Sequence, residues 1–270
     1  MTAAARDTLL PAAENRRMFD GIARRYDLLN ALMSLGRHRS WRRRAVEALL
    51  AHGGREFLDI GCGTGDVALA VLRQSPEARV TGIDLSTAML DIAEAKTRAA
   101  GLGGRVLYQA GDATAMTFPD RSFDGIVMAF CLRNIADRAA AFGEMRRVLR
   151  PGGTVAILEL TKPAGRLAGL AHRLYTRRLV PLLGALLSRG SAYRYLADSI
   201  DHFPPPAAIT AALAGAGFTQ ARHEPLTAGF VTLFSALAVG TEPDPPSPSR
   251  GGTTSVSSAA APDTEGGPPA

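Results

Sequence analysis

Short apolar runs alternate with helix-like patterns through most of the chain. Apolar runs bounded by glycine or polar residues are typical of buried strands, and apolar residues at every third or fourth position are typical of helices. The expected strands are residues 56–60, 79–84, 105–110, 125–130, 154–159, 218–225 and 229–239, and the expected helices begin near residues 67, 87, 139 and 207. This alternation predicts an α/β fold, with a seven-stranded, mostly parallel sheet, helices on both faces and an antiparallel last strand.

The pattern also divides the chain into segments. Residues 1–14 are small and polar, so we expect a flexible N-terminus, and residues 15–240 form the expected domain, which opens with helices at 15–52. A basic amphipathic stretch at 165–200 is either a plain surface helix or a helical lid over an apolar substrate. Residues 241–270 are Pro, Ser, Gly, Thr and Ala without an apolar pattern, which predicts a disordered tail.

A glycine-rich loop follows the first predicted strand. Gly61, Gly63 and Gly65 alternate with other residues between that strand and the helix that begins near residue 67. Glycines in this position let a ligand approach the main chain closely. The sixth place of a dinucleotide fingerprint is Asp66 here, and the Gly-Lys-Ser/Thr ending of a phosphate-binding loop is absent. The loop therefore predicts a ligand without phosphates at this contact, although a tight turn without a ligand stays open.

The second predicted strand ends in an acid. Asp84 lies about 20 residues beyond the glycine loop, the separation at which a carboxylate can accept hydrogen bonds from ribose hydroxyls. A helix begins just after it, so an N-cap role for Asp84 is the alternative. The glycine loop and Asp84 together favour the binding of a nucleoside.

Charge and cysteine content narrow the partners and the compartment. The formal net charge of the 270 residues is +6, which suits an anionic surface such as phospholipid or nucleic acid. Cys62 and Cys131 have no metal or redox spacing, so we expect no disulfide framework, no metal and a reducing cytosol. No signal peptide and no apolar stretch long enough for a membrane span are visible. We therefore expect a cytoplasmic protein, at most bound to the inner face of the membrane.

Several motifs along the chain match one family. They are Phe19-Asp20-x-Ile22-Ala23-x-Arg25-Tyr26-Asp27-x-x-Asn30, Leu32-Met33-Ser34-x-Gly36-x-His38-x-x-Trp41-Arg42, the loop at 61–66, Asp84-x-Ser86, Gly111-Asp112-Ala113, Leu132-Arg133-Asn134-Ile135, Pro151-Gly152-Gly153 and Tyr193-x-Tyr195-Leu196. Together they resemble the UbiE/MenG quinone-biosynthesis C-methyltransferases, over about residues 19–237. The resemblance implies a Rossmann-like class I methyltransferase fold with S-adenosylmethionine as methyl donor.

The resemblance also implies which residues hold the cofactor. Thr64 and the glycines of the loop hold the methionine portion, Asp84 holds the ribose, and Asp112 with Ala113 lies at the adenine. The backbone near Ala129 completes the site.

The implied reaction places a methyl group on a carbon of a polyprenylated demethylmenaquinol, the last step of menaquinone biosynthesis. That carbon becomes nucleophilic when a neighbouring hydroxyl loses its proton, so the site must accept a proton or stabilise the phenolate. We predict that Arg133 stabilises that oxygen and that Asn134 and Tyr26 orient the substrate; a structural ion pair is the alternative for Arg133. His202 is the histidine to test as a base, although a capping or core role is expected for it.

Other functions stay open at this point. The ubiquinone precursor, a polyprenyl-methoxy-benzoquinol, is the alternative substrate, alone or in addition. A non-catalytic quinone- or lipid-binding protein of the same fold is a second alternative, which the intact glycine loop, Asp84 and Arg133 disfavour. No Asn-Pro-Pro-Tyr type motif is present, which argues against nucleic acid as the substrate. The basic start of the helix at 40–50 is either a solvated face or a contact for anionic headgroups, which the predicted lid would also touch. A homodimer is one option for the assembly.

Overall fold

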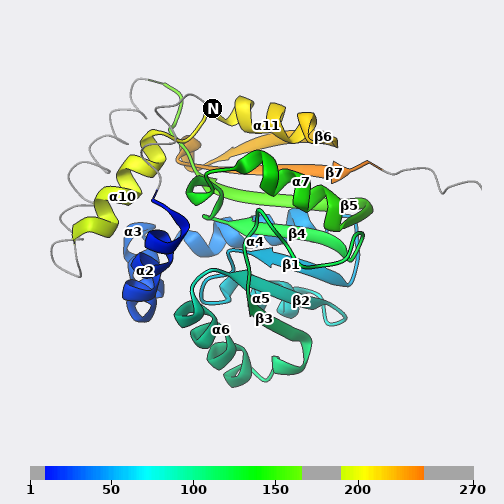
Figure 1. The fold of residues 1–270 in the computed structure, drawn as a ribbon, viewed down its shortest axis with the longest axis horizontal. Coiled ribbons are helices and arrows are strands. Elements are labelled where there is room, and N and C mark those ends of the chain that lie inside the picture. The colour runs from blue at the N-terminus through cyan, green and yellow to red at the C-terminus, as the bar shows by residue number, and fades with distance from the viewer. Residues whose placement is uncertain (1–9, 166–189, 240–270) are drawn as a thin grey trace, which may run out of the picture. The chain divides into compact units, whose positions relative to one another are not determined.

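The computed structural model of the protein describes residues 10–165 and 190–239. Its seven strands form one sheet in the order β3-β2-β1-β4-β5-β7-β6, seen from the bottom to the top of Figure 1. The strands are β1 (Glu56–Ile60), β2 (Arg79–Asp84), β3 (Val106–Ala110), β4 (Phe123–Ala129), β5 (Leu149–Leu160), β6 (Phe218–Leu226) and β7 (Val231–Ala238). β7 pairs antiparallel with both neighbours, while β1 to β5 pair in parallel. The predicted fold class is confirmed.

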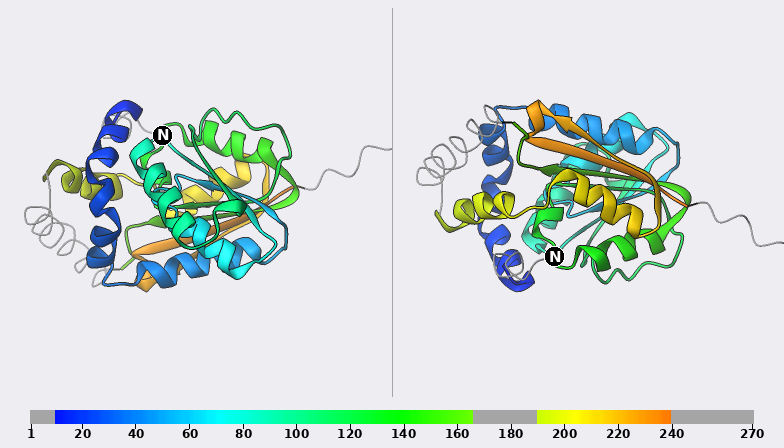
Figure 2. Two further views of the ribbon diagram at one scale, coloured as in Figure 1. Left: turned by 90° about the horizontal axis from the view of Figure 1, so that it is seen from below. Right: turned by 90° about the horizontal axis from the view of Figure 1, so that it is seen from above.

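Helices cover both faces of the sheet (Figure 2). One core cluster joins the sheet to α4 (His38–Leu50), α5 (Asp66–Gln74) and α6 (Thr87–Ala99). The other core cluster joins the opposite face to α7 (Arg138–Val148) and α11 (Pro206–Gly215). The central strands β1 and β4 are buried on both sides, which agrees with their nearly continuous apolar sequences.

The fifth strand is longer than the sequence pattern predicts. β5 begins at Leu149, so the predicted turn at 150–153 lies inside this strand. The pairing with β4 shifts register there: Leu149 pairs with Phe123, and the next pair is Thr154 with Gly125. A side chain at Gly153 would come within 3.0 Å of the Asp124 carbonyl oxygen, so the close approach of β4 requires glycine there. Turn chemistry alone does not reveal that a partner strand pairs on both sides of the turn.

The remaining helices gather where the parallel strands end, at the left of Figure 1. They are α2 (Ala12–Ile22), α3 (Tyr26–Met33) and α10 (Gly190–Asp201), with the short 3-10 helices η1 (Ala23–Arg25) and η3 (Leu132–Asn134). Most of the predicted lid, residues 166–189, and the predicted tail at 241–270 lie outside the described residues. In the part of the chain that is described, no helix combines the length and the apolarity needed to span a bilayer.

Candidate active site

A cavity lies at the carboxyl ends of β1 and β4, where the strand order reverses. We call it the switch-point cavity; it has a volume of about 100 Å³. Ligands of open α/β sheets bind at such a position because the loops on the two sides of the reversal separate there. Eight residues predicted for the site line it: Tyr26, Gly61, Gly63, Asp84, Asp112, Ala113, Ala129 and Asn134. The structure therefore brings together residues that lie far apart in the sequence.

The glycine loop forms the floor of this cavity without side chains. Gly61 and Gly63 have φ angles of +65° and +53°. A Cβ atom at Gly61 would lie 2.3 Å from the Cys131 sulfur, so only glycine fits there. The amides of Gly61 and Cys62 both donate to the Ile83 carbonyl oxygen, at 2.8 Å and 3.0 Å, which fixes the loop against β2. The bare backbone is therefore rigid and open to a ligand.

Asp84 stands at the end of β2 beside this loop. Its Oδ2 accepts a hydrogen bond from the Gly63 amide and its Oδ1 accepts one from the Ser86 amide, both at 2.9 Å. Ser86, and not Asp84, caps α6, because the Ser86 hydroxyl accepts from the Met89 amide. Burial raises the pKa of Asp84, while the amides of Ser86 and Gly63 oppose that rise. Each carboxylate oxygen keeps a further lone pair for a ribose hydroxyl.

Asp112, predicted to lie at the adenine, has one carboxylate oxygen available to a ligand. Its Oδ1 accepts from the amide and the hydroxyl of Thr114, both at 2.8 Å, whereas its Oδ2 makes no hydrogen bond to a described residue. A carboxylate oxygen in that state can accept from an exocyclic amine. A bare glycine loop, two acids and the apolar side chains between them fit a nucleoside that carries no phosphate, such as S-adenosylmethionine with its positively charged sulfonium.

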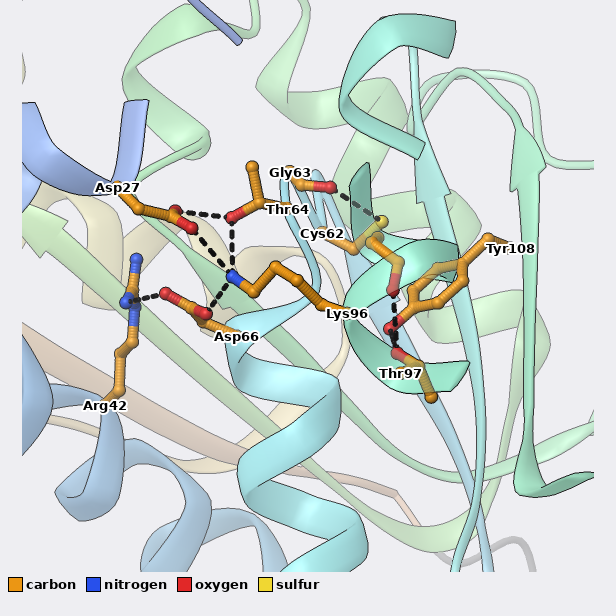
Figure 3. A network of polar contacts seen from close by, with 10 residues as sticks. Asp27, Arg42, Cys62, Gly63, Thr64, Asp66, Lys96, Thr97 and Tyr108 are labelled. Carbon is orange, nitrogen blue, oxygen red and sulfur yellow. Dashed lines mark hydrogen bonds and ion pairs between the residues drawn. The ribbon is translucent and has the colours of Figure 1, made fainter. Parts of the chain in front are cut away.

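Thr64 points away from the switch-point cavity and into a polar network (Figure 3). Its hydroxyl donates to Asp27 Oδ1 at 2.6 Å, and Lys96 Nζ donates to Asp27 Oδ2 at 2.8 Å. Lys96 also pairs with Asp66, whose other oxygen accepts from Arg42. These five residues, the Lys96 network, tie α3, α4 and α6 to the glycine loop. Because Asp27 follows Tyr26, the network also holds Tyr26 at the cavity.

We predict that Lys96→Met lowers the free energy of unfolding by about 2 kcal/mol, since it removes charge-assisted hydrogen bonds from two partly buried carboxylates. Chemical denaturation of the purified protein measures this. Arg98→Met on the same helix is the control, because that side chain is 78% exposed and its pair with Glu94 spans 3.8 Å. Equal losses for the two variants would contradict the stabilising role of the Lys96 network.

The network also predicts a pH dependence. Burial raises the pKa of Asp66, but Arg42 and Lys96 outweigh it, so the pKa is lowered from 3.8. A carboxylate with a lowered folded-state pKa stabilises the fold above the unfolded-state pKa, and this stabilisation is lost as the pH falls through the folded-state value. Without Lys96, the pKa of Asp66 should lie closer to its unfolded-state value. As the pH falls from neutral to below about 4, the free energy of unfolding should therefore decrease less for Lys96→Met than for the wild-type protein.

A second, larger cavity adjoins the first. We call it the apolar cavity; it has a volume of about 280 Å³. Its apolar walls include Met18, Ile22, Leu29, Met33, Trp41, Leu160 and Phe230. The two cavities share Phe19, Tyr26 and Phe130. Apolar atoms make up most of the surface of the apolar cavity, and the polar side chains that line it include Arg133, His38 and Tyr195. Such a lining suits an apolar ring with a small number of polar substituents.

Arg133 is buried at the wall of the apolar cavity. Its Nη1 pairs with Glu159 Oε1 at 3.0 Å and donates to the Phe130 carbonyl oxygen. Its Nε is buried without a partner, while Nη2 makes no hydrogen bond to a described residue. Burial alone would lower the pKa of Arg133, but Glu159 and Tyr26 outweigh it and raise the pKa above its ordinary value. Arg133 is thus a permanent cation, and the structural ion pair given as its alternative role is present. Its Nη2 has no partner among the described residues, and the predicted role at the substrate oxygen stays a prediction.

Tyr26 and Asn134 lie at the boundary between the cavities. Asn134 Oδ1 accepts from the Tyr195 hydroxyl at 3.2 Å, which connects the switch-point cavity to α10. Burial raises the pKa of Tyr26 and of Tyr195, so both phenols are neutral donors at neutral pH. Of the remaining predicted residues, Gly65 serves packing: a Cβ there would lie 2.5 Å from the Tyr108 hydroxyl.

Three residues of the site were missed by the sequence interpretation. Phe130 has a φ of +59° and lines both cavities, but no sequence signal marks a left-handed phenylalanine. Trp41 lines the apolar cavity, where its Nε1 donates to the Thr227 hydroxyl at 2.8 Å. His38 is buried there, whereas His202 is exposed and contacts the Asp198 carbonyl oxygen. Only the family motif at 32–42 pointed to Trp41 and His38.

Asp59 and the cysteines complete the surroundings of the loop. Burial raises the pKa of Asp59 to about 7, and neither of its oxygens makes a hydrogen bond of ordinary geometry. Cys62 and Cys131 are free thiols. Within residues 10–165 and 190–239, no group of three or more His, Cys, Asp and Glu residues could hold a metal ion.

Comparison with known proteins identifies relatives along nearly the whole domain. The model of the ubiE/COQ5 methyltransferase family matches residues 9–238. A demethylmenaquinone methyltransferase of Thermus thermophilus is 45% identical over 227 residues, which cover 84% of this chain and 100% of the relative. A protein of Geotalea daltonii named ubiquinone/menaquinone biosynthesis C-methyltransferase UbiE is 41% identical over 219 residues, which cover 81% and 93% of the two chains.

Solved structures share the fold at low identity. The phosphoethanolamine N-methyltransferase 2 of Haemonchus contortus, in complex with S-adenosyl-L-methionine, is 20% identical with a TM-score of 0.56, covering 73% of this chain and 52% of that one. A putative methyltransferase of Haloferax volcanii, solved with its Trm112 activator, is 18% identical with a TM-score of 0.60, covering 82% and 97%. These similarities bear on the fold alone.

Proposed function

The chain belongs to the ubiE/COQ5 methyltransferase family, and from that membership we propose that it transfers a methyl group from S-adenosylmethionine to a ring carbon of demethylmenaquinol. Membership confirms the family predicted from the motifs. One observation carries the proposed substrate: an apolar cavity of about 280 Å³ adjoins the switch-point cavity across Phe19, Tyr26 and Phe130. A quinol ring in the apolar cavity would face a nucleoside-bound methyl donor in the other.

The residues of the two cavities would bind the cofactor, orient the quinol and stabilise its developing charge. When bound, S-adenosylmethionine supplies a methyl group already activated by the positive sulfur. Asp84 and Asp112 hold the nucleoside, and the bare glycine loop accepts its methionine portion. The shared aromatic side chains hold the quinol ring in line with the methyl group, and orientation of this kind lowers a barrier by several kcal/mol. Arg133 stabilises the negative charge that develops on the quinol oxygen.

The ubiquinone precursor is the second candidate substrate. It is supported by the relatives named for both pathways, such as the Geotalea daltonii protein. Demethylmenaquinol is preferred because relatives from Thermus thermophilus and Deinococcus radiodurans, at 45% and 41% identity, are named for that substrate alone. The walls of the apolar cavity are also mainly hydrocarbon and aromatic, which suits a bicyclic ring without methoxy groups.

The test uses the purified full chain with radiolabelled S-adenosylmethionine and two quinols of equal prenyl length. We expect methylated product from demethylmenaquinol and at least tenfold less from the polyprenyl-methoxy-benzoquinol. Reversed rates would favour the ubiquinone pathway. Cofactor binding with no product from either quinol would instead support a non-catalytic quinone-binding protein.

A basic surface with an apolar tip lies beside the entrance to the apolar cavity, and we propose that it contacts an anionic membrane. Leu28, Leu32 and Leu35 are 55%, 41% and 83% exposed, and Leu35 also lines the apolar cavity. Arginines 24, 25, 37 and 39, which flank these leucines in the sequence, are exposed. Leucines that enter the headgroup boundary and arginines that contact anionic lipid are the two usual components of peripheral membrane binding. The prenyl tail of the quinol would pass into the bilayer here.

We predict that Leu35→Asn lowers binding to vesicles of anionic phospholipid about tenfold, because one buried leucine contributes roughly 1.5 kcal/mol or more. Asparagine tolerates the φ of +51° at this position, so the backbone is unchanged. Vesicle sedimentation measures the effect. Leu107→Thr is the matched control, since Leu107 is 58% exposed but lies on β3, away from α3. Equal losses in the two variants would contradict the proposed surface.

A further inference from the structure

The proposed reaction needs a general base that removes the proton from the quinol hydroxyl, and none of the roles described above supplies one. Arg133 cannot accept it, because its pKa is raised and it stays charged. Tyr26 and Tyr195 are neutral phenols whose pKa values are raised by burial, so they are poor bases. A group with an available lone pair is needed inside the apolar cavity.

His38 is the histidine that lines this cavity among those that the structure describes. It is the first residue of α4 and is 7% exposed. The other described histidines are at positions 52, 202 and 223, and none of them lines the cavity. His38 therefore shares the cavity with Arg133, Tyr26 and Tyr195.

The hydrogen bonds of Ser34 assign the tautomer of His38. The Ser34 hydroxyl donates its single proton to the Asn30 carbonyl oxygen at 2.6 Å. At its 2.7 Å contact with His38 Nδ1, the same oxygen must then accept, so Nδ1 carries the hydrogen. The lone pair of the ring is consequently on Nε2, which makes no hydrogen bond to a described residue and is not enclosed by its neighbours.

Burial favours the neutral form of the His38 imidazole. Burial is the main cause of its lowered pKa, and Arg42 and Arg39 on α4 act in the same direction. Asp66 on α5 and Asp27 on α3 act in the opposite direction. Both acids pair with Lys96, and Asp66 also pairs with Arg42. A neutral ring with a free Nε2 is the state that a general base requires.

We infer that His38 is the catalytic base, which accepts the hydroxyl proton of the quinol at Nε2. The O–H bond breaks, an N–H bond forms, and the electron pair stays on the quinol oxygen, where Arg133 stabilises it. The ring carbon then forms its bond to the methyl group, while the pair of the broken sulfur–methyl bond remains on sulfur. The carbon loses its hydrogen as a proton to water, and the imidazolium returns its proton to the oxygen. One proton is released in each turnover.

This inference rests on the proposed methyl transfer, so the wild-type protein is assayed first with demethylmenaquinol. His38→Gln should then lower kcat about 100-fold at pH 7. Its kcat should recover toward that of the wild type as the pH approaches the pKa of the quinol, because the substrate then ionises without a base. Imidazole added to His38→Ala should restore part of the activity.

Two controls separate the chemical role from a structural one. Trp41 is the single tryptophan of the chain and lines the same cavity, so quenching of its fluorescence reports quinone binding independently of turnover. The quinone Kd of His38→Gln should stay within about threefold of the wild-type value. His202→Ala, at an exposed histidine, should retain full activity.

The outcomes distinguish the two proposals. An inactive wild-type protein would overturn the proposed function itself. An active wild-type protein with an equally active His38→Gln variant would overturn only the role of His38. A variant that loses quinone binding in proportion to kcat, without rescue by imidazole or by high pH, would make His38 a structural residue and also overturn the inference.

Discussion

Asp84→Asn is expected to raise the Kd for S-adenosylmethionine by at least about 100-fold, as measured by isothermal titration calorimetry. The carboxylate accepts from the Gly63 and Ser86 amides with one oxygen each, and it has lone pairs left for the two ribose hydroxyls. An asparagine places an NH₂ group where one of these oxygens stood. Because each oxygen accepts from a backbone N–H, that NH₂ group would face another donor. Hydrogen bonds to a charged group contribute about 1.5–3 kcal/mol each, and both the ligand contacts and the loop anchor are weakened.

The same variant has a matched control and a pH signature. Asp91→Asn, at an exposed position of α6, should leave the Kd unchanged. Because burial raises the pKa of Asp84, cofactor affinity in the wild-type protein should begin to fall at a higher pH than the 3.8 of an ordinary aspartate would give. The affinity of Asp84→Asn should lack this fall. An unchanged affinity for Asp84→Asn would place the ribose elsewhere in the switch-point cavity.

The convergence of the glycine loop with the acids in the candidate site could be predicted, because each of these segments is local in sequence. β2 spans Arg79–Asp84 and α6 spans Thr87–Ala99, as the apolar periodicity predicted. Parallel strands bring their carboxyl ends to one edge of the sheet, so the glycine loop, Asp84 and Asp112 had to converge there. The positive φ angles of Gly61, Gly63 and Gly65 follow from the same pattern of alternate glycines.

The part of the candidate site around the apolar cavity depends on contacts between distant segments, which no local rule supplies. The hydrogen bond from Thr64 to Asp27 joins residues 37 positions apart, and the Trp41 contact with Thr227 joins residues 186 positions apart. The family motif predicts that Thr64 holds the methionine portion, but the motif does not reveal that Asp27 lies beside it. In the structure, the Thr64 hydroxyl donates to Asp27. The role of His38 depends on the Ser34 hydroxyl and on the surrounding cavity, neither of which is visible in sequence spacing.

Arg133 is the second residue whose replacement should have a very large effect. We expect Arg133→Met to lower kcat about 10³-fold, because a cation at the developing oxyanion typically contributes that order of rate. The change also leaves Glu159 buried with its charge uncompensated, which costs about 3–5 kcal/mol of stability. A loss of activity in the single variant would therefore combine chemistry with unfolding.

The double variant Arg133→Met/Glu159→Gln separates these two effects. It removes both charges of the buried pair, so the free energy of unfolding should recover much of the loss, since replacing a buried ion pair by neutral groups is often nearly neutral. The kcat should nevertheless remain about 10³-fold low, because no cation faces the quinol oxygen. Denaturant unfolding measures the first quantity, and the methyl-transfer assay at saturating cofactor and quinol measures the second. If activity returned together with stability, Arg133 would act only by holding Glu159 and the Phe130 carbonyl in place. Persistent loss of activity in a stable protein would instead place the guanidinium at the reacting oxygen.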